Sequence, residues 1–334
     1  MNYPEMSVPK ISIITPSFNQ GAYIEHTILS VLDQGYPNLE YFVIDGGSTD
    51  ATTDIIKKYA SRISHWVSEK DSGQSEAINK GLKMATGDIV SWLCSDDLYV
   101  PGTLSRVAGI FGDNRDRVMV HGRSILFDEK GKEEIKGAEA IDLKLRYFSV
   151  IPFPQPSSFF RKRLIEEQGY LREDLHFAMD FDLLIRAALN YEIHPVDDIL
   201  SKYRLHRESK TVTQLKHFES EWVIVFSKFL RSISGGEDYI SGLKTCNLYA
   251  EGNDLYIHHR TFTASDIKKI VLYFLDFMSH LSYHFLESKI AGQRLSYIRS
   301  LDKDFYNSRN LGKIALRAKY YPSSIIKLIR KIAR

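Results

Sequence analysis

The chain has 334 residues, of which 43% are hydrophobic, 26% charged and 12% aromatic. This composition is ordinary for a globular protein and excludes a disordered tail protein, a collagen-like fibre and a coiled coil. A formal net charge of +2 gives no general reason to expect binding to nucleic acid. At roughly 100–200 residues per domain, the length predicts two domains, or one large domain with an extension.

Charge is unevenly distributed along the chain. Residues 311–334 carry seven basic side chains and no acidic one, which leaves 37 basic and 42 acidic residues in the rest. At about 100° per residue of a helix, Ile325, Ile329 and Ile332 share one side, and Arg330 and Arg334 share the other. An apolar stripe opposite a basic stripe is typical of a helix that lies on an anionic membrane. We expect this tail to bind such a surface; a helix packed on the body and a disordered end are the alternatives.

Cysteine usage and hydropathy indicate where the protein resides. Only Cys94 and Cys246 occur, without spacing typical of a disulfide framework or a zinc site. The first ten residues lack the basic and apolar regions of a secretory signal. No uncharged apolar run approaches the ~18 residues that span a bilayer. We therefore expect a cytoplasmic protein, peripheral on the inner face of the plasma membrane where the tail binds.

Strands and helices alternate in the first hundred residues. Short apolar runs predict strands at 11–15, 41–44, 64–68 and 89–93, and helical spacing predicts helices at 22–32, 53–60 and 75–85. This order predicts an α/β fold, with a mixed, mostly parallel sheet and helices on both faces. Each strand ends in polar residues, and ligands bind beyond the carboxyl ends of such strands. These side chains should therefore meet at one rim of the sheet.

The pattern changes after about residue 118. Residues 118–127 and 157–160 predict strands, 182–188 a helix, and 195–203 an extended segment. Beyond Thr213 the sequence is helical and aromatic, most clearly at 218–229 and 267–286. We place the domain boundary near residue 214, with a mainly helical C-terminal region over 214–334.

Three polar segments are candidates for chemistry. Asp96 and Asp97 are adjacent at a strand end, where they repel each other unless a cation is nearby, and hard oxygen ligands suit Mg²⁺ or Mn²⁺. Asp45 precedes two glycines that allow a ligand to approach the backbone. The segment Gly73–Gly81 begins a helix whose N-terminus can face an anion. Taken singly, each segment is also consistent with an ordinary turn or helix start.

Six motifs in this order resemble family 2 glycosyltransferases, which have the GT-A fold and act in the synthesis of bacterial polysaccharides and cell-surface glycans. The resemblance covers about 8–212. It rests on Thr15-Pro16-Ser17-Phe18-Asn19, Asp45-Gly46-Gly47-Ser48-Thr49-Asp50, Asp71-Ser72-Gly73 with Asn79-Lys80-Gly81, Gly87-Asp88 before Ser95-Asp96-Asp97, Ala178-Met179-Asp180-Phe181-Asp182, and Tyr203-Arg204-Leu205-His206. It implies a catalytic domain over 1–213, with the nucleotide sugar bound by 8–100 and the acceptor side formed by 101–213.

The resemblance also implies roles for single residues. Those implied to bind the nucleotide and sugar are Thr15, Pro16, Asn19, Asp45, Asp71, Gly73, Asn79, Lys80, Asp96 and Arg204. Asp97 is implied as the ligand of Mn²⁺ or Mg²⁺, with His206 as a further candidate for the cation or the diphosphate. Ser95 stands where the family often has a first aspartate, which leaves fewer carboxylates for the cation.

The resemblance implies a mechanism as well. A nucleotide sugar, with UDP as the expected nucleotide, donates its sugar to a hydroxyl of a glycan or lipid-linked glycan. Asp180 removes the proton from that hydroxyl, because a hydroxyl is a poor nucleophile until a base takes its proton. One displacement inverts the anomeric carbon. Met179 replaces the usual glutamate, and Asp180 is also a candidate helix N-cap; we expect Asp182 to be structural.

Two other functions stay open at the level of sequence. A nucleotidyltransferase has a related sheet, but normally a Gly-rich basic loop after its first strand, where this chain has Thr15–Gln20. The second is a protein that binds a sugar nucleotide without transferring the sugar. The sequence has no Walker A loop, HExxH motif or Gly-x-Ser-x-Gly motif, so it does not support a nucleotide hydrolase, a zinc protease or a serine hydrolase.

Overall fold

A computed structural model describes residues 8–137 and 142–320. The chain divides into two compact units, the first formed by Met1–Leu143 with Pro152–Phe218 and the second by Lys144–Ile151 with Glu219–Arg334. The apolar and basic stripes expected near the C-terminus lie mainly in 321–334, outside the described residues.

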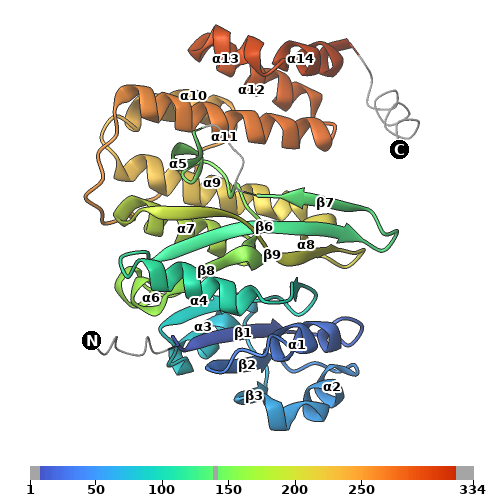
Figure 1. The fold of residues 1–334 in the computed structure, drawn as a ribbon. Coiled ribbons are helices and arrows are strands. Elements are labelled where there is room, and N and C mark those ends of the chain that lie inside the picture. The colour runs from blue at the N-terminus through green and yellow to red at the C-terminus, as the bar shows by residue number, and fades with distance from the viewer. Residues whose placement is uncertain (1–7, 138–141, 321–334) are drawn as a thin grey trace. The chain divides into compact units, whose positions relative to one another are not determined.

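A nine-stranded sheet runs through the first unit, in the order β3-β2-β1-β4-β8-β6-β9-β5, with β7 paired to β6 (Figure 1). The strands are β1 Ile11–Ser17, β2 Leu39–Asp45, β3 His65–Ser68, β4 Ile89–Trp92, β5 Leu98–Tyr99, β6 Met119–Asp128, β7 Glu133–Lys136, β8 Ser158–Arg161 and β9 Ile193–Leu205. The pairs β3–β2, β2–β1 and β1–β4 are parallel. Strand β8 is antiparallel to both β4 and β6. The mixed, mostly parallel sheet expected from the sequence is therefore confirmed.

Seven helices of the described residues belong to the first unit. They are α1 Ile24–Leu32, α2 Thr52–Lys58, α3 Gln74–Met84, α4 Thr103–Asp113, α6 Lys162–Gln168, α7 Met179–Asn190 and α8 Lys210–Thr213. Ile24, Ile28 and Val31 are fully buried on one face of α1, which is the apolar periodicity that predicts this helix. The strands and helices predicted before residue 100 all occur, with ends shifted by a few residues, as end fraying allows.

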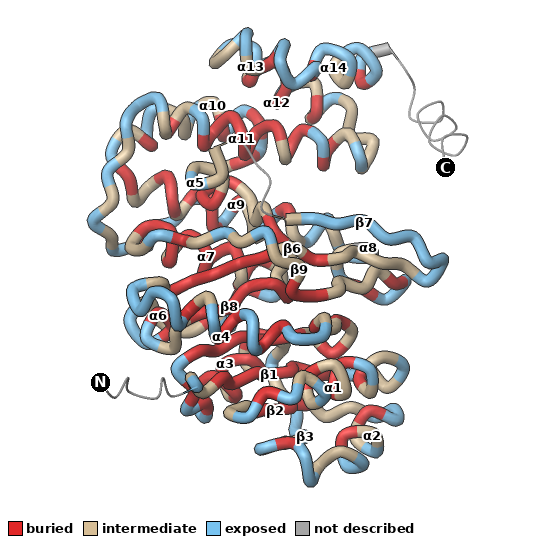
Figure 2. Tube along the Cα trace, in the orientation of Figure 1, coloured by how far each residue is buried: buried red, intermediate tan, exposed pale blue. Residues whose placement is uncertain are grey.

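Apolar side chains pack on both faces of the sheet. On one face, Ile11 and Ile13 of β1 join Ile28 of α1 and Phe111 of α4 in a buried cluster. On the same sheet, Trp92 of β4 is 1% exposed and stacks on Phe160 of β8 with 5.4 Å between ring centroids. Trp92 is therefore packed in the core, although it also reaches the lining of the pocket described below. Figure 2 shows the contrast between the buried central strands and the exposed strand β7.

The second unit is helical. Its helices are α10 Ile240–Thr245, α11 Ala264–His284, α12 Ser288–Leu301, α13 Lys303–Ser308 and α14 Leu311–Tyr320, and the division of the chain falls within α5 Leu143–Arg146 and α9 Leu215–Ser232. Phe226 stacks on Phe274 with 3.7 Å between centroids, so aromatic packing joins α9 to α11. Among the described residues, no helix is both long and apolar enough to span a membrane.

Candidate active site

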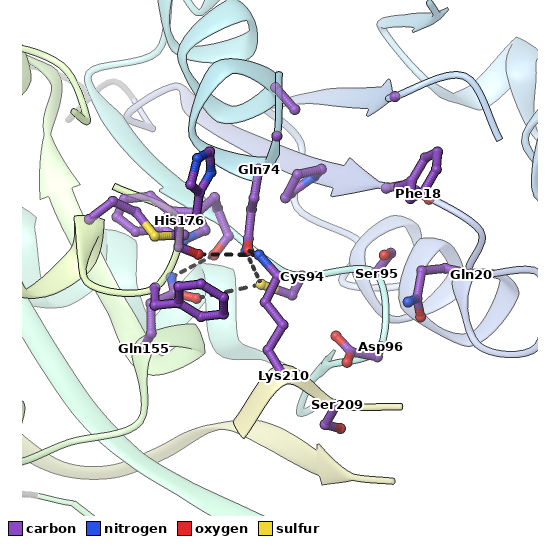
Figure 3. A pocket seen from close by; sticks show the side chains of 18 of the residues that line it. Phe18, Gln20, Gln74, Cys94, Ser95, Asp96, Gln155, His176, Ser209 and Lys210 are labelled. Carbon is purple, nitrogen blue, oxygen red and sulfur yellow. Dashed lines mark hydrogen bonds between the residues drawn. The ribbon is translucent and has the colours of Figure 1, made fainter. Parts of the chain in front are cut away.

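A pocket of about 620 Å³ lies beyond the carboxyl ends of the parallel strands (Figure 3). All its lining residues belong to the first unit. Pro16 and Ser17 reach it from the end of β1, Gly46 from the end of β2, Asp71 from the loop after β3, and Asp96 from the loop after β4. Four strand ends thus contribute to one pocket, because parallel strands place their carboxyl ends at the same edge of the sheet.

One end of the pocket combines an aromatic ring with polar atoms that lack partners. Phe18 is 59% exposed and lines the pocket. Ser17 Oγ and Gln20 Oε1 are buried and have no hydrogen-bond partner among the described residues. Buried polar groups are costly unless they are hydrogen-bonded, so a ligand with a flat face and polar edges is suited to this end of the pocket.

Asp71 lies in the same part of the pocket and is held by the loop around it. Its Oδ1 accepts a hydrogen bond of 3.0 Å from the backbone N–H of Gly73. Burial raises the pKa of Asp71, aided by the nearby Glu76. A Cβ atom at Gly46 would lie 2.9 Å from the Asp71 carboxylate, so the glycine is required for this close approach. Gly73 has a φ of +135°, which also favours glycine.

The N-terminus of α3 opens onto the pocket through Ser72, Gly73 and Gln74. Glu76 already occupies part of this helix end, since its Oε2 accepts hydrogen bonds from the backbone N–H and the hydroxyl of Ser72. Gln74 extends inward and donates from Nε2 to Cys94 Sγ at 3.1 Å (Figure 3).

Asp96 and Asp97 form an acidic pair that the end of β9 holds in place. The backbone N–H of Arg204 donates to Asp97 Oδ1 at 2.9 Å, and Arg204 Nε donates to the backbone carbonyl of Asp96 at 2.9 Å. Oδ2 of Asp96 lies 2.9 Å from His206 Nε2. Each carboxylate uses one oxygen in these bonds, and the other has no hydrogen bond from the described residues.

The acidic pair fits a divalent cation with oxygen ligands. Asp97 is 2% exposed, and burial together with the Asp96 carboxylate raises its pKa well above the ordinary value. Ligand atoms of Asp96, Asp97 and Cys94 all lie within 4.8 Å of one another. Burial also raises the pKa of the Cys94 thiol, and a protonated thiol is a poor metal ligand. The two carboxylate oxygens without protein partners are therefore the suitable donors, and such oxygens suit Mg²⁺ or Mn²⁺.

Asp180 lines the pocket from the first turn of α7. Its Oδ1 accepts a hydrogen bond of 2.8 Å from the backbone N–H of Phe181. Met179 beside it is 6% exposed and also lines the pocket. Asp182, two residues further on, is fully buried and pairs with Arg186 at 2.8 Å, which agrees with the structural role expected for it.

Seven of the residues predicted from sequence to bind the nucleotide or the cation do not themselves line the pocket. They are Thr15, Asn19, Asp45, Asn79, Lys80, Arg204 and His206. Pro16, Asp71, Gly73, Asp96, Asp97 and Asp180, by contrast, do line it. Membership of a motif therefore does not by itself decide whether a side chain reaches the pocket.

Asp45 and Thr15 are fully buried at the ends of β2 and β1. The Asp45 carboxylate accepts hydrogen bonds from the hydroxyls of Ser48 and Ser68 at 2.5 and 2.6 Å, and from the backbone of the Gly-Gly loop. Thr15 Oγ1 is 3.0 Å from the Tyr41 hydroxyl. Both side chains stabilise the strand ends from which the pocket is built.

Asn79 and Lys80 of α3 likewise contact protein groups. Asn79 donates to the Leu171 carbonyl at 2.9 Å and accepts from the Leu171 N–H at 3.0 Å, so it fixes a distant loop against the helix. Lys80 pairs with Glu69 and Glu76, each at 3.0 Å.

Asn19 contacts the loop that follows β2. It has a φ of +52°, and its Oδ1 accepts from the backbone N–H of Thr49 at 2.9 Å. It therefore connects the loop after β1 to the loop after β2.

Several pocket residues carry no signal that the sequence analysis detected. Lys210 Nζ lies within 3.2 Å of both Gln74 Oε1 and the His176 carbonyl, and Gln155 Oε1 lies 4.0 Å from Cys94 Sγ. These residues come from segments far apart in the chain, and only folding brings them together (Figure 3). In the sequence, Lys210 lies four residues after His206 of the last motif, and this short separation is a hint that Lys210 lies near the pocket.

Comparison with known proteins decides the family. Residues 12–193, more than half of the chain, match the model of glycosyl transferase family 2. The chain belongs to this family. An uncharacterized glycosyltransferase of Rickettsia felis is 30% identical over 240 residues, which are 69% of this chain and 39% of the relative. The putative teichuronic acid biosynthesis glycosyltransferase TuaG of Bacillus subtilis is 43% identical over 101 residues, 29% of this chain and 40% of that protein. The family 2 chain thus spans about two fifths of the length of these two relatives.

Solved structures confirm the GT-A fold expected for this family 2 chain. TarS 1–349 of S. aureus in complex with UDP is 20% identical with a TM-score of 0.52, covering 94% of this chain and 93% of TarS 1–349. The mannosyltransferase PcManGT of Pyrobaculum calidifontis in complex with GDP-Man and Mn²⁺ is 16% identical with a TM-score of 0.55, covering 92% and 88%.

Proposed function

We propose that this chain is a metal-dependent, inverting glycosyltransferase that transfers a sugar from a UDP-linked donor to a hydroxyl of a glycan or lipid-linked glycan. The observation that carries the proposal is a single pocket whose lining includes Asp71, the pair Asp96 and Asp97, and Asp180. A sugar transferase needs a donor site, a group that stabilises the leaving diphosphate and a base for the acceptor. The pocket contains candidate residues for all three.

The end of the pocket near Phe18 is the proposed site of the nucleotide. An exposed aromatic ring can stack on a base, and Ser17 Oγ and Gln20 Oε1 offer hydrogen bonds to its edges. Asp45, Asn19 and Thr15 would act indirectly, by fixing the strand ends and loops that form this end. UDP is the first candidate, since TarS is solved with UDP and UDP-GlcNAc, and GDP is the second, since PcManGT is solved with GDP-Man.

Asp97 is the proposed cation ligand, with Asp96 beside the donor. The free oxygen of Asp97 would hold Mn²⁺ or Mg²⁺ and that of Asp96 would face the donor, and PcManGT is solved with Mn²⁺. Such an ion, when bound, neutralises the charge that develops on the leaving diphosphate. Arg204 keeps both aspartates in place through its bonds to Asp97 Oδ1 and to the Asp96 carbonyl.

Asp180 is the proposed general base. Its carboxylate takes the proton of the acceptor hydroxyl as the new bond from that oxygen to the anomeric carbon forms, and the bond to the diphosphate breaks in the same step. The product is the inverted glycoside, and the nucleoside diphosphate leaves with the bonding electrons. The hydrogen bond from the Phe181 N–H fixes one oxygen of the base at the start of α7.

The acceptor and the location are proposed from the relatives and the tail. TuaG is named a putative teichuronic acid biosynthesis glycosyltransferase, which favours a cell-surface glycan as acceptor. Lipid-linked acceptors of this kind lie at membranes, and the basic, apolar pattern of 311–334 suits an anionic surface. We propose a cytoplasmic protein on the inner face of the plasma membrane, which agrees with the two free thiols of Cys94 and Cys246.

A thermal-shift screen tests the donor site. Wild-type protein is heated with UDP, GDP, dTDP and their sugar conjugates, with and without Mn²⁺. We expect stabilisation by a uridine nucleotide that requires the cation; a ligand at 100 times its dissociation constant adds about 2.7 kcal/mol to the free energy of unfolding. Absence of any nucleotide-dependent shift would contradict the proposal.

Product analysis then distinguishes the proposed enzyme from the two alternatives. A transferase releases free nucleoside diphosphate from its sugar nucleotide when an acceptor is supplied. A binding protein without transferase activity shows the thermal shift and no release, and a nucleotidyltransferase forms pyrophosphate from a nucleoside triphosphate and a sugar phosphate.

A further inference from the structure

A row of polar side chains crosses the pocket, and Figure 3 shows the hydrogen bonds along it. Lys210 Nζ donates to Gln74 Oε1 at 3.2 Å, and Gln74 Nε2 donates to Cys94 Sγ at 3.1 Å. Cys94 Sγ lies 4.0 Å from Gln155 Oε1, and Gln155 Nε2 donates to the backbone carbonyl of Trp92 at 3.0 Å. The row therefore joins α8, α3 and the end of β4 to the 3₁₀ helix η2 Gln155–Ser157.

The two ends of the row fix the orientation of both glutamine amides. An ammonium group can only donate, so Gln74 turns Oε1 toward Lys210 and Nε2 toward Cys94. A backbone carbonyl can only accept, so Gln155 turns Nε2 toward Trp92. Each amide nitrogen carries two hydrogens and uses one of them in these bonds, and the described residues supply no acceptor for the other. Gln74 and Gln155 can thus each donate a further hydrogen bond to a ligand.

The middle of the row lies close to both the acidic pair and the proposed base. Ligand atoms of Cys94, Asp96 and Asp97 are within 4.8 Å of one another. Burial and the carboxylates of Asp97 and Asp96 raise the pKa of the Cys94 thiol, and the Asp180 carboxylate contributes to this effect, so Asp180 is near Cys94 as well. In a single displacement the anomeric carbon lies between the leaving diphosphate and the attacking hydroxyl. The transferred sugar must therefore lie beside Cys94 and its two glutamine neighbours.

We propose that Gln74 and Gln155 bind the transferred sugar and select one with a substituent oxygen that only accepts hydrogen bonds, an inference that rests on the proposed function of the pocket. The carbonyl of an acetamido group and the carboxylate of a uronic acid supply such oxygens. A hydroxyl also accepts, but its own proton then needs an acceptor, and the amide oxygens of the row are turned toward Lys210 and Cys94. The positive charge of Lys210 beside Gln74 further favours a carbonyl or carboxylate oxygen.

Calorimetric titration of the wild type with three nucleotide sugars tests the selection. UDP-N-acetylglucosamine and UDP-glucuronate each differ from UDP-glucose in one substituent, and UDP alone is the reference, all in the presence of Mn²⁺. We expect at least one of the first two to bind about tenfold more tightly than UDP-glucose, which is the effect of a hydrogen bond that UDP-glucose cannot make as well. The preferred ligand distinguishes an acetamido group from a carboxylate. The galactose-configured set covers the epimers, and equal affinities in both sets would overturn the proposal.

Methionine variants test the two glutamines separately. Methionine has about the length of glutamine and no N–H, so Gln74→Met and Gln155→Met should each lose about tenfold in affinity for the preferred nucleotide sugar and keep the wild-type affinity for UDP. Gln214→Met is the matched control, because Gln214 also lines the pocket but makes no bond in the row. A preference that survives in one variant would remove that glutamine from the site, and one that survives in both would refute the proposal.

The reference ligand separates failure of this inference from failure of the proposed function. Binding of UDP with Mn²⁺ and no discrimination among the sugars would refute the role of the row and leave the donor site in place. Lack of binding by UDP and by every UDP-sugar would contradict the proposed function and this inference with it. Melting temperatures without ligand show whether each variant is folded, and the wild-type comparison remains decisive where a variant is not.

Discussion

The proposed role of a side chain in this family 2 chain depends on whether it reaches the pocket as well as on its chemistry. Asp180 and Asp182 are two residues apart on α7, yet the first lines the pocket and the second is fully buried against Arg186. Residues two apart on a helix point in different directions, which is why one motif can supply both the proposed base and a structural ion pair. Asp96 and Asp97 also differ in their contacts, since the side chain of His206 lies against Asp96 and the backbone N–H of Arg204 donates to Asp97.

Replacement of Asp180 by asparagine should abolish transfer and preserve binding. An amide cannot accept the proton of the acceptor, so we expect kcat to fall by roughly 10²–10⁴. The dissociation constant for UDP with Mn²⁺, measured by calorimetry, should stay at the wild-type value. Asp182→Asn is the matched control: it removes the buried negative charge that pairs with Arg186, so it should lower the melting temperature, which Asp180→Asn should not. Unchanged transfer by Asp180→Asn would show that another group is the base.

Asp97→Asn should change stability in a pH-dependent way. Burial raises the pKa of Asp97, so the folded protein binds a proton more tightly than the unfolded chain, and this carboxyl lowers stability as the pH rises above about 4. Without metal, the variant should therefore melt above the wild type at pH 7.5, and the difference should shrink toward pH 4.

Added Mn²⁺ should reverse the order at pH 7.5, because only the wild type keeps the carboxylate that would bind the cation. Calorimetric melting curves at several pH values, with Mn²⁺ and with a chelator, measure both effects. A variant that is equally stabilised by Mn²⁺ would exclude Asp97 as the ligand.

Secondary-structure elements build the pocket through a few close contacts. Helix α3 can approach β1 because Gly81 has no side chain; a Cβ there would lie 2.6 Å from two carbons of Ile14. This approach sets the position of the helix N-terminus, where Gly73 and Gln74 line the pocket. Asn79 on the same helix fixes the Leu171 loop, which precedes the pocket residues His176 and Phe177.

Gly81→Ala should therefore destabilise the protein although alanine favours helices. The overlap with Ile14 must be relieved by movement of α3, and overpacking of this kind costs about 1–3 kcal/mol. Gly109→Ala on α4 is the matched control, since a Cβ there meets no atom within 4 Å, and it should stabilise by about 0.5–1 kcal/mol. Urea denaturation of the two variants measures both values, and equal effects would show that α3 is not packed as described.

At the scale of the whole molecule, the chain combines an α/β unit that contains the pocket with a helical unit of aromatic core. Within the second unit, α14 buries Leu311 and Ala318, while Lys313, Leu316 and Arg317 are exposed. A basic helix face with an exposed leucine is consistent with the proposal that the C-terminal segment binds an anionic surface.

Two truncations distinguish a loss of membrane binding from a loss of folded structure. Deletion of 321–334 leaves the buried residues of α14 in place and should reduce binding to liposomes that contain anionic lipid, while donor hydrolysis continues. Deletion of 311–334 also removes buried Leu311, so it should in addition lower the melting temperature. Co-sedimentation with anionic and with neutral vesicles measures binding, and equal sedimentation of the first truncation and the full chain would refute a role for the tail.

The six motifs and their order indicate the family by resemblance. The amino-acid sequence also predicts the order of strands and helices and the rim where polar residues gather, because apolar periodicity and turn residues are local properties and parallel strands end at one edge. It could also identify Asp71, Asp96, Asp97 and Asp180 as candidates, since each follows a strand or begins a helix.

Which side chains reach the pocket depends on contacts between segments that are distant in the chain. Asn79 belongs to the same motif as Asp71, and Asp45 to the motif before it, yet the polar groups of Asn79 and Asp45 bind the protein itself. Lys210 and Gln155, in contrast, reach the pocket from segments more than fifty residues apart. The physical reason is that a buried polar group must find a partner, and whether the partner is a neighbouring loop or a ligand depends on contacts between residues distant in the chain.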